Sequence, residues 1–87
     1  MRANRAYELL VRKGGRGPAL LAGPGRLDHV EIVEIASGEV ALLWDTPAVQ
    51  TGKLSRALRE DLARLEDDEF IARWRHWQPM ERLPGVS

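Results

Sequence analysis

The sequence of 87 residues contains no cysteine, and only two of its 13 basic residues are lysines. Without cysteine, the chain cannot form disulfides, Cys-ligated zinc sites or iron–sulfur clusters, and it has no thiol nucleophile. Small secreted domains often need such cross-links, so the composition favours a cytoplasmic protein. The excess of arginine over lysine, together with frequent Ala, Leu and Gly, points to a bacterial source with a GC-rich genome.

Long hydrophobic runs and an excess of charge are also missing. No segment approaches the about 18 apolar residues of a membrane span, and Glu8 and Arg12 interrupt the first apolar run, so we expect neither a membrane segment nor a signal peptide. The formal net charge is +0. Dedicated nucleic-acid-binding domains of this size usually carry a basic excess, because phosphate neutralisation supplies most of their affinity. The overall charge therefore argues against a nucleic-acid partner.

A chain of this length forms one domain. We expect a compact unit over residues 1–78 and an irregular tail over 79–87, where two prolines disfavour a helix. Charge is unevenly distributed: residues 1–27 contain six basic side chains and one acidic side chain, whereas residues 28–48 contain five acidic side chains and no Lys or Arg. This asymmetry predicts either strands that pair across a sheet or complementary surfaces on two molecules.

A hairpin is the clearest local signal. The segments HVEIVEI and EVALLW are rich in β-branched and large apolar residues, which predicts strands near 28–36 and 39–45. Gly38 supplies the positive φ that the turn needs. The alternation slips between Ile32 and Val33, which indicates a bulge or burial on both faces.

The two segments before the hairpin are less regular. Residues 6–12 fit a helical stripe as well as a strand, and we favour a strand, because a third strand would support the hairpin and pair basic with acidic residues. Residues 14–26 are rich in Gly and Pro. They form, on this interpretation, a long connection with one short helical turn or strand.

The last third of the chain has helical periodicity. Leucines recur at positions 54, 58, 62 and 65, after Thr51 as the expected N-cap. The aromatic stripe that follows would lie roughly 130° away on a continuous straight helix. We therefore predict two helices, about 51–65 and 68–77, with Asp67 or Asp68 as the cap of the second. The predicted fold class is α+β: a three-stranded antiparallel sheet with a central hairpin, 28–45, packed against two C-terminal helices.

The segment RWRHW, residues 73–77, raises three possible roles: a protein core, a partner interface or a surface that stacks on nucleic-acid bases. Phe70, Trp74 and Trp77 share one face of the predicted helix, which is typical of burial, so packing in the protein's own core is the leading interpretation. The alternative is a homodimer or partner interface, whose candidate residues are Phe70, Trp74, Trp77 and Trp44. Base stacking is the least supported role.

Basic residues define a further candidate site. The arginines of residues 2–26 and those of RWRHW could together contact an anion or a nucleic acid. The candidate residues are Arg12, Lys13, Arg16, Arg73 and Arg75.

Signals for cofactors or catalysis are weak. Gly52 and Lys53 lie near a helix start, as in a phosphate-binding loop, but Pro47 and Leu54 occupy positions where that motif needs Gly and Ser or Thr. A metal pair at His29 and Glu31 would share a strand face but lacks a third ligand. No serine has the setting of a nucleophile. We therefore predict no catalytic residue, metal or cofactor.

The predicted function follows from the predicted fold. Helices on one side of a small sheet leave apolar residues on the other side without a partner, and such surfaces are commonly covered by a second copy. We expect a non-catalytic protein-interaction module that forms a homodimer. Two alternatives stay open: a nucleic-acid accessory protein, and a ligand-binding or catalytic subunit whose site is completed by another chain.

Overall fold

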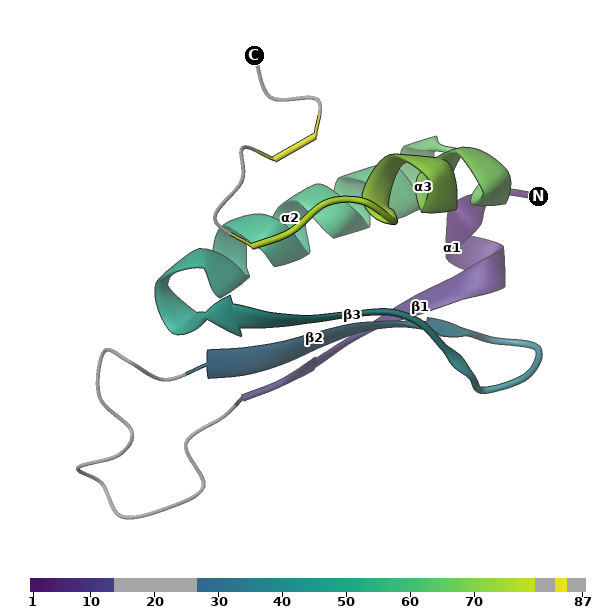
Figure 1. Ribbon diagram of the computed structural model, residues 1–87. Coiled ribbons are helices and arrows are strands. Elements are labelled where there is room, and N and C mark those ends of the chain that lie inside the picture. The colour runs from purple at the N-terminus through teal and green to yellow at the C-terminus, as the bar shows by residue number, and fades with distance from the viewer. Residues whose placement is uncertain (14–26, 80–82, 85–87) are drawn as a thin grey trace.

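The structure, a computed structural model, describes residues 1–13, 27–79 and 83–84. It has two layers, because the helices cover one face of a three-stranded antiparallel sheet (Figure 1). This confirms the predicted α+β fold with two C-terminal helices. The expected short element within 14–26, including Arg16, lies outside the described residues, as does most of the tail. Within the described ranges, no helix is both long and apolar enough to cross a membrane.

The sheet consists of β1 (Tyr7–Arg12), β2 (Leu27–Glu34) and β3 (Val40–Pro47), with β2 in the centre. All three predicted strands are present, with ends that differ by at most two residues. Gly38 in the hairpin turn has a φ of 75°, a left-handed conformation that glycine adopts without strain. The β2–β3 register shifts after Ile32, where the sequence predicted a bulge or burial on both faces. Ile32 pairs with Leu42 and Val33 with Val40, so the extra residue is Ala41 of β3.

A four-residue helix, α1 (Ala3–Ala6), precedes β1 and was not predicted. Ala3 is fully buried, and its backbone N–H donates to the carbonyl of Leu65 at 2.9 Å. Arg2 and Glu66 form an isolated antiparallel bridge. The first residues therefore dock on the junction between the two C-terminal helices. These contacts join positions more than 60 apart, so local periodicity could not predict them.

Helix α2 (Ala48–Arg64) begins three residues before the predicted start. Its N-cap is Pro47, whose φ of −53° is already close to the helical value. The prediction of Thr51 as the N-cap is therefore wrong. The Thr51 hydroxyl instead donates to Oδ2 of Asp28 at 2.8 Å. Since Asp28 is only 1% exposed, this hydrogen bond ties the first turns of α2 to β2 inside the protein.

Helix α3 (Asp67–Trp74) is separate from α2, as predicted, because the backbone of Leu65 is extended. Its N-cap is Glu66, which forms a capping box with Glu69. The prediction of Asp67 or Asp68 as the cap is thus wrong by one or two positions. Both aspartates lie instead in the first helical turn, where negative charge interacts favourably with the helix dipole.

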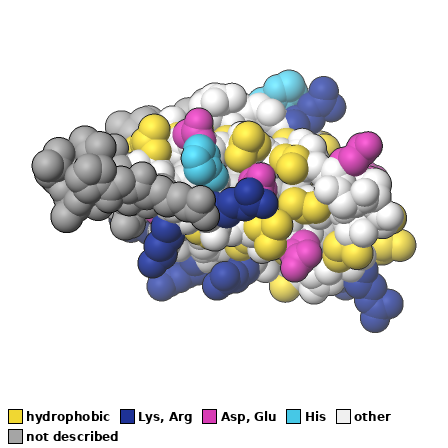
Figure 2. Space-filling view, turned by 90° about the horizontal axis from the view of Figure 1, so that it is seen from below, with side chains coloured by type: hydrophobic (Ala, Val, Ile, Leu, Met, Phe, Trp, Pro, Cys, Tyr) yellow, Lys and Arg dark blue, Asp and Glu magenta, His cyan; other side chains and the backbone are white. Residues whose placement is uncertain are grey.

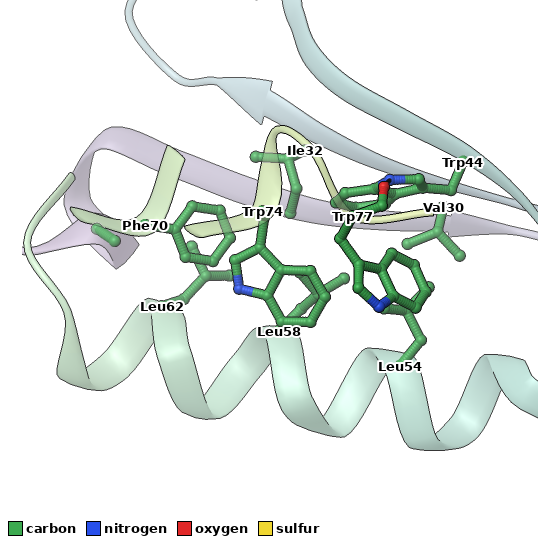
Figure 3. Packing of buried hydrophobic residues seen from close by; sticks show 10 residues of the cluster. Val30, Ile32, Trp44, Leu54, Leu58, Leu62, Phe70, Trp74 and Trp77 are labelled. Atoms are coloured by element: carbon green, nitrogen blue, oxygen red, sulfur yellow. Dashed lines mark hydrogen bonds between the residues drawn. The ribbon is translucent and has the colours of Figure 1, made fainter. Parts of the chain in front are cut away.

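The core lies between the sheet and the helices (Figure 3). Leu54, Leu58 and Leu62 of α2 point toward the aromatic rings and the central strand, and all three are buried. Tyr7 extends this core at the start of β1, where its ring stacks on that of Phe70 with centroids 6.1 Å apart. Burial raises the pKa of the Tyr7 hydroxyl above 10.0, and nearby acidic side chains raise it further.

Candidate interaction surface on the open face of the sheet

The four aromatic residues predicted as interface candidates lie inside the protein. Phe70 and Trp74 are 0% exposed, and Trp44 and Trp77 are 5% exposed. The indole of Trp74 meets those of Trp44 and Trp77 edge-on, with centroids 5.9 and 5.5 Å away (Figure 3). Burial in the protein's own core, the leading interpretation of RWRHW, is confirmed. The assignment of these four side chains to an exposed interface is corrected, because the chain itself covers them.

The polar atoms of two tryptophans are also satisfied within the chain. Nε1 of Trp74 donates to Oδ2 of Asp61 at 2.9 Å, and Nε1 of Trp44 donates to the carbonyl of Trp77 at 3.0 Å. Asp61 is 5% exposed and also accepts a hydrogen bond from Arg64 at 3.0 Å. A buried carboxylate needs such partners, because an unpaired charge in the interior is costly. These hydrogen bonds fix the rings in the core.

The predicted basic site is not assembled in the structure. Arg12 and Lys13 lie at the end of β1, whereas Arg73 and Arg75 lie in and directly after α3, in the helical layer. Arg12 and Arg73 each form an ion pair with an acidic side chain of this chain. The described candidates therefore belong to two separate parts of the molecule and do not form one anion-binding surface.

Two other arginines, which the sequence did not single out, lie closer together. Arg56 and Arg59 are exposed on α2, one helical turn apart. They border a shallow hollow between α2 and β1, lined by Val11, Gly52, Ser55, Arg56, Arg59 and Glu60. The i, i+3 spacing could have revealed this pair, but only the fold shows that it lies beside β1.

The two weak cofactor signals are explained by ordinary structure. Gly52 and Lys53 lie inside α2, not in a loop before it, so no phosphate-binding loop exists there. The ring of His29 contacts the carboxylate of Asp45 on β3. In the parts of the chain that the structure describes, no cluster of three or more His, Cys, Asp or Glu side chains could hold a metal ion.

The side of the sheet that faces away from the helices, here called the open face, carries exposed apolar side chains (Figure 2). Strand alternation turns Val30 and Ile32 into the core and their neighbours outward. Leu43 is 55% exposed and Leu27 is 48% exposed. The residues of the open face are Glu8, Leu10, Arg12, Leu27, His29, Glu31, Val33, Val40, Leu43 and Asp45.

Strand pairing arranges this face into rows. One row is Leu10, Glu31 and Leu43, so one leucine lies on each side of an acidic side chain. The next row is Arg12, His29 and Asp45, with a basic group on one edge strand and an acidic group on the other. The open face thus combines apolar area with charges of both signs.

Ion pairs connect the charges of the open face. Nε of Arg12 lies 3.5 Å from Oε2 of Glu31, and the side chains are 70% and 13% exposed. This oxygen of Glu31 is buried and has no hydrogen-bond donor among the described residues. Asp45, which contacts His29, is 57% exposed. The ends of the row, Arg12 and Asp45, therefore remain accessible to charges outside the chain.

The open face combines apolar area with accessible charges, as protein–protein interfaces do. Leucine side chains supply the apolar part, and Arg12 and Asp45 supply the accessible charges. Comparisons of the chain with protein-family models, with curated proteins and with solved structures find no match.

Proposed function

We propose that this chain is a non-catalytic, cytoplasmic protein-interaction module that forms a homodimer through the open face of its sheet. The observation that carries the proposal is the exposure of Leu27 and Leu43 on one face of a sheet whose other face is packed. Fully burying a leucine contributes about 1.5–3 kcal/mol. Contact with another apolar surface would recover part of that free energy.

A second copy is the occupant that best fits the charges of this face. A surface with only acidic or only basic groups would repel its own copy, whereas the open face has Arg12 at one edge and Asp45 at the other. A two-fold dimer uses the same patch on both subunits, so the patch must be complementary to itself. Opposite charges at opposite edges meet that requirement.

The size of the face predicts a weak dimer. Three strands about 4.8 Å apart, with about 3.3 Å per residue, give a surface of roughly 15 by 25 Å. That is smaller than the about 800 Å² that each partner buries in a standard stable interface. We therefore expect a dimer that dissociates on dilution into the micromolar range.

Sedimentation equilibrium over a wide concentration range tests the proposal. The wild-type chain should change from monomer to dimer as concentration rises, and Leu43→Lys should remain a monomer. Val49→Lys is the matched control, because Val49 is also an exposed apolar side chain, 81% exposed, and lies at the start of α2. This control should dimerise like the wild type. A wild-type chain that stays monomeric at every concentration would refute the homodimer.

The same samples test the nucleic-acid alternative, which the neighbouring arginines of α2 keep open. If that alternative is right, the monomer should bind a single-stranded oligonucleotide at about 50 mM salt, and the affinity should fall steeply as the salt concentration rises. Arg56→Glu combined with Arg59→Glu should then abolish binding, while Leu43→Lys should not affect it. If the wild-type monomer binds the oligonucleotide in this salt-sensitive way, nucleic-acid binding replaces the homodimer as the proposed function.

A further inference from the structure

We infer that the two copies pair face to face about a two-fold axis parallel to β2, so that Arg12 of each copy lies opposite the partner's Asp45. This inference rests on the proposed homodimer and specifies its geometry. The observation behind it is the row formed by Arg12, His29 and Asp45 across the three strands. The row has a basic end on β1 and an acidic end on β3.

The direction of the axis decides which residues meet. A two-fold axis along the central strand exchanges the two edge strands and keeps each row at the same level. The Arg12 end of one row then faces the Asp45 end of the same row in the partner, twice in each dimer. The same operation brings Leu10 opposite the partner's Leu43, also twice, so the apolar residues of the neighbouring row meet each other.

An axis across the strands pairs different charges. If it passes through the row of Leu10 and Leu43, it places β1 against the partner's β1, so Arg12 comes opposite the partner's Glu8. Asp45 then faces the part of the partner's β3 beyond Leu43, where the first strand residues are Val40 and Ala41. This axis pairs Arg12 with an acidic side chain but leaves Asp45 opposite apolar residues, whereas the axis parallel to β2 pairs both ends of the row and leaves Glu8 opposite the partner's Val40. Only the axis parallel to β2 predicts that Asp45→Arg weakens the dimer, so that variant distinguishes the two geometries.

The inferred geometry also places a like charge near the axis. Glu31 lies on the central strand, so an axis along β2 brings it close to the partner's Glu31. Arg12 of the same copy, 3.5 Å away, offsets part of this repulsion. Glu31→Gln should therefore strengthen the dimer, because it removes the repulsion while leaving each Arg12 free to pair with the partner's Asp45.

Charge reversal followed by mixing tests the geometry directly. In the inferred dimer, Arg12→Asp creates two acidic pairs and Asp45→Arg creates two basic pairs. Each variant alone should therefore dimerise with a Kd about tenfold weaker than the wild type. An equimolar mixture of the two should recover wild-type affinity, because both pairs become oppositely charged in the heterodimer.

The measurement is sedimentation equilibrium of each variant and of the mixture, at low salt where the charges are least screened. Arg59→Asp, the same charge change on α2, is the matched control and should dimerise like the wild type. Thermal unfolding of each variant confirms that it is folded. A wild type that dimerises, with a mixture that does not recover affinity, would overturn the inferred axis alone. A wild type that never dimerises would overturn the proposed function as well.

Discussion

The same strands form both faces of the sheet, but one face is buried and the other is exposed. On the covered face, Val30 and Ile32 are 0% exposed, and Trp44 is 5% exposed. On the open face, Leu43, the neighbour of Trp44, is 55% exposed. The difference shows that apolar content alone does not define the core of this protein. The helices complete the core on one face, and apolar side chains of the other face stay exposed in the described structure.

Polar groups differ between the faces in the same way. On the covered side, Asp61 binds an indole N–H and two arginines, at 2.9, 3.0 and 3.7 Å. On the open side, the charged ends of the row are more than half exposed and their contacts are ion pairs at the surface. Buried hydrogen bonds stabilise the fold more than such surface ion pairs do. The covered face should thus determine stability, and the open face should determine association.

Among substitutions on the two sides of the sheet, Trp74→Ala is expected to change the free energy of unfolding the most. The substitution should lower the free energy of unfolding by about 3–5 kcal/mol, because it opens a large cavity in the core. That loss is comparable to the entire stability of many small domains. Urea unfolding followed by far-UV circular dichroism measures it, with Trp74→Phe as the milder comparison. A loss below about 1 kcal/mol would show that the covered face does not determine stability.

The second largest effect is expected for Asp61→Ala. This change leaves the buried N–H of Trp74 without an acceptor, so the free energy of unfolding should fall by about 2–3 kcal/mol. Glu60→Ala, at the adjacent exposed position of α2, should change it by less than about 0.5 kcal/mol. Urea unfolding of the two variants side by side gives the comparison, and equal losses would contradict the structural role of Asp61.

A smaller effect, of opposite sign, is expected for Thr46→Val. Thr46 is 0% exposed, and its hydroxyl has no hydrogen-bond partner among the described residues. Valine keeps the shape of the side chain and removes a buried hydroxyl that makes no hydrogen bond with the described residues. The free energy of unfolding should therefore stay equal or rise by up to about 1 kcal/mol. A clear loss of stability on thermal unfolding would show that the hydroxyl does have a partner, for example a buried water molecule.

The smallest effect on stability is expected for Leu43→Lys, on the open face. In the monomer, the long side chain of lysine can lie along the sheet with its charge in water. The free energy of unfolding, measured at a concentration where the wild type is monomeric, should therefore change by less than about 0.5 kcal/mol. A loss as large as that for Asp61→Ala would mean that Leu43 belongs to the core.

Sequence patterns predicted the fold well wherever the signal was local. The apolar pattern located the two hairpin strands, and the first strand was favoured because a third strand would support the hairpin. The register shift after Ile32 lies where the sequence predicted a bulge or burial on both faces. The change of stripe between the leucines and the aromatic residues indicated the break between α2 and α3. Helix starts were less accurate, because Pro47 and Glu66 act as N-caps without the side chains that usually mark that position.

Features set by contacts between distant residues could not be predicted. Helix α1 is held by a backbone bond from Ala3 to Leu65, and no local pattern specifies that partner. The aromatic residues illustrate the same limit, since their spacing was compatible with both a core and an interface. Only the fold shows that Trp77 packs back on Trp44 and that the leucine beside Trp44 is the exposed one.

The central claim, that the open face binds a second copy, is tested most directly by amide chemical shifts during dilution. Heteronuclear spectra of the labelled chain, recorded from about 1 mM down to low micromolar concentration, should show shifts that change with concentration. A dimer through the open face predicts changes at Leu10, His29 and Leu43 on the sheet, and constant shifts at Arg59 on α2 and Arg75 after α3. Spectra that do not change with concentration, or changes confined to the helices, would contradict it.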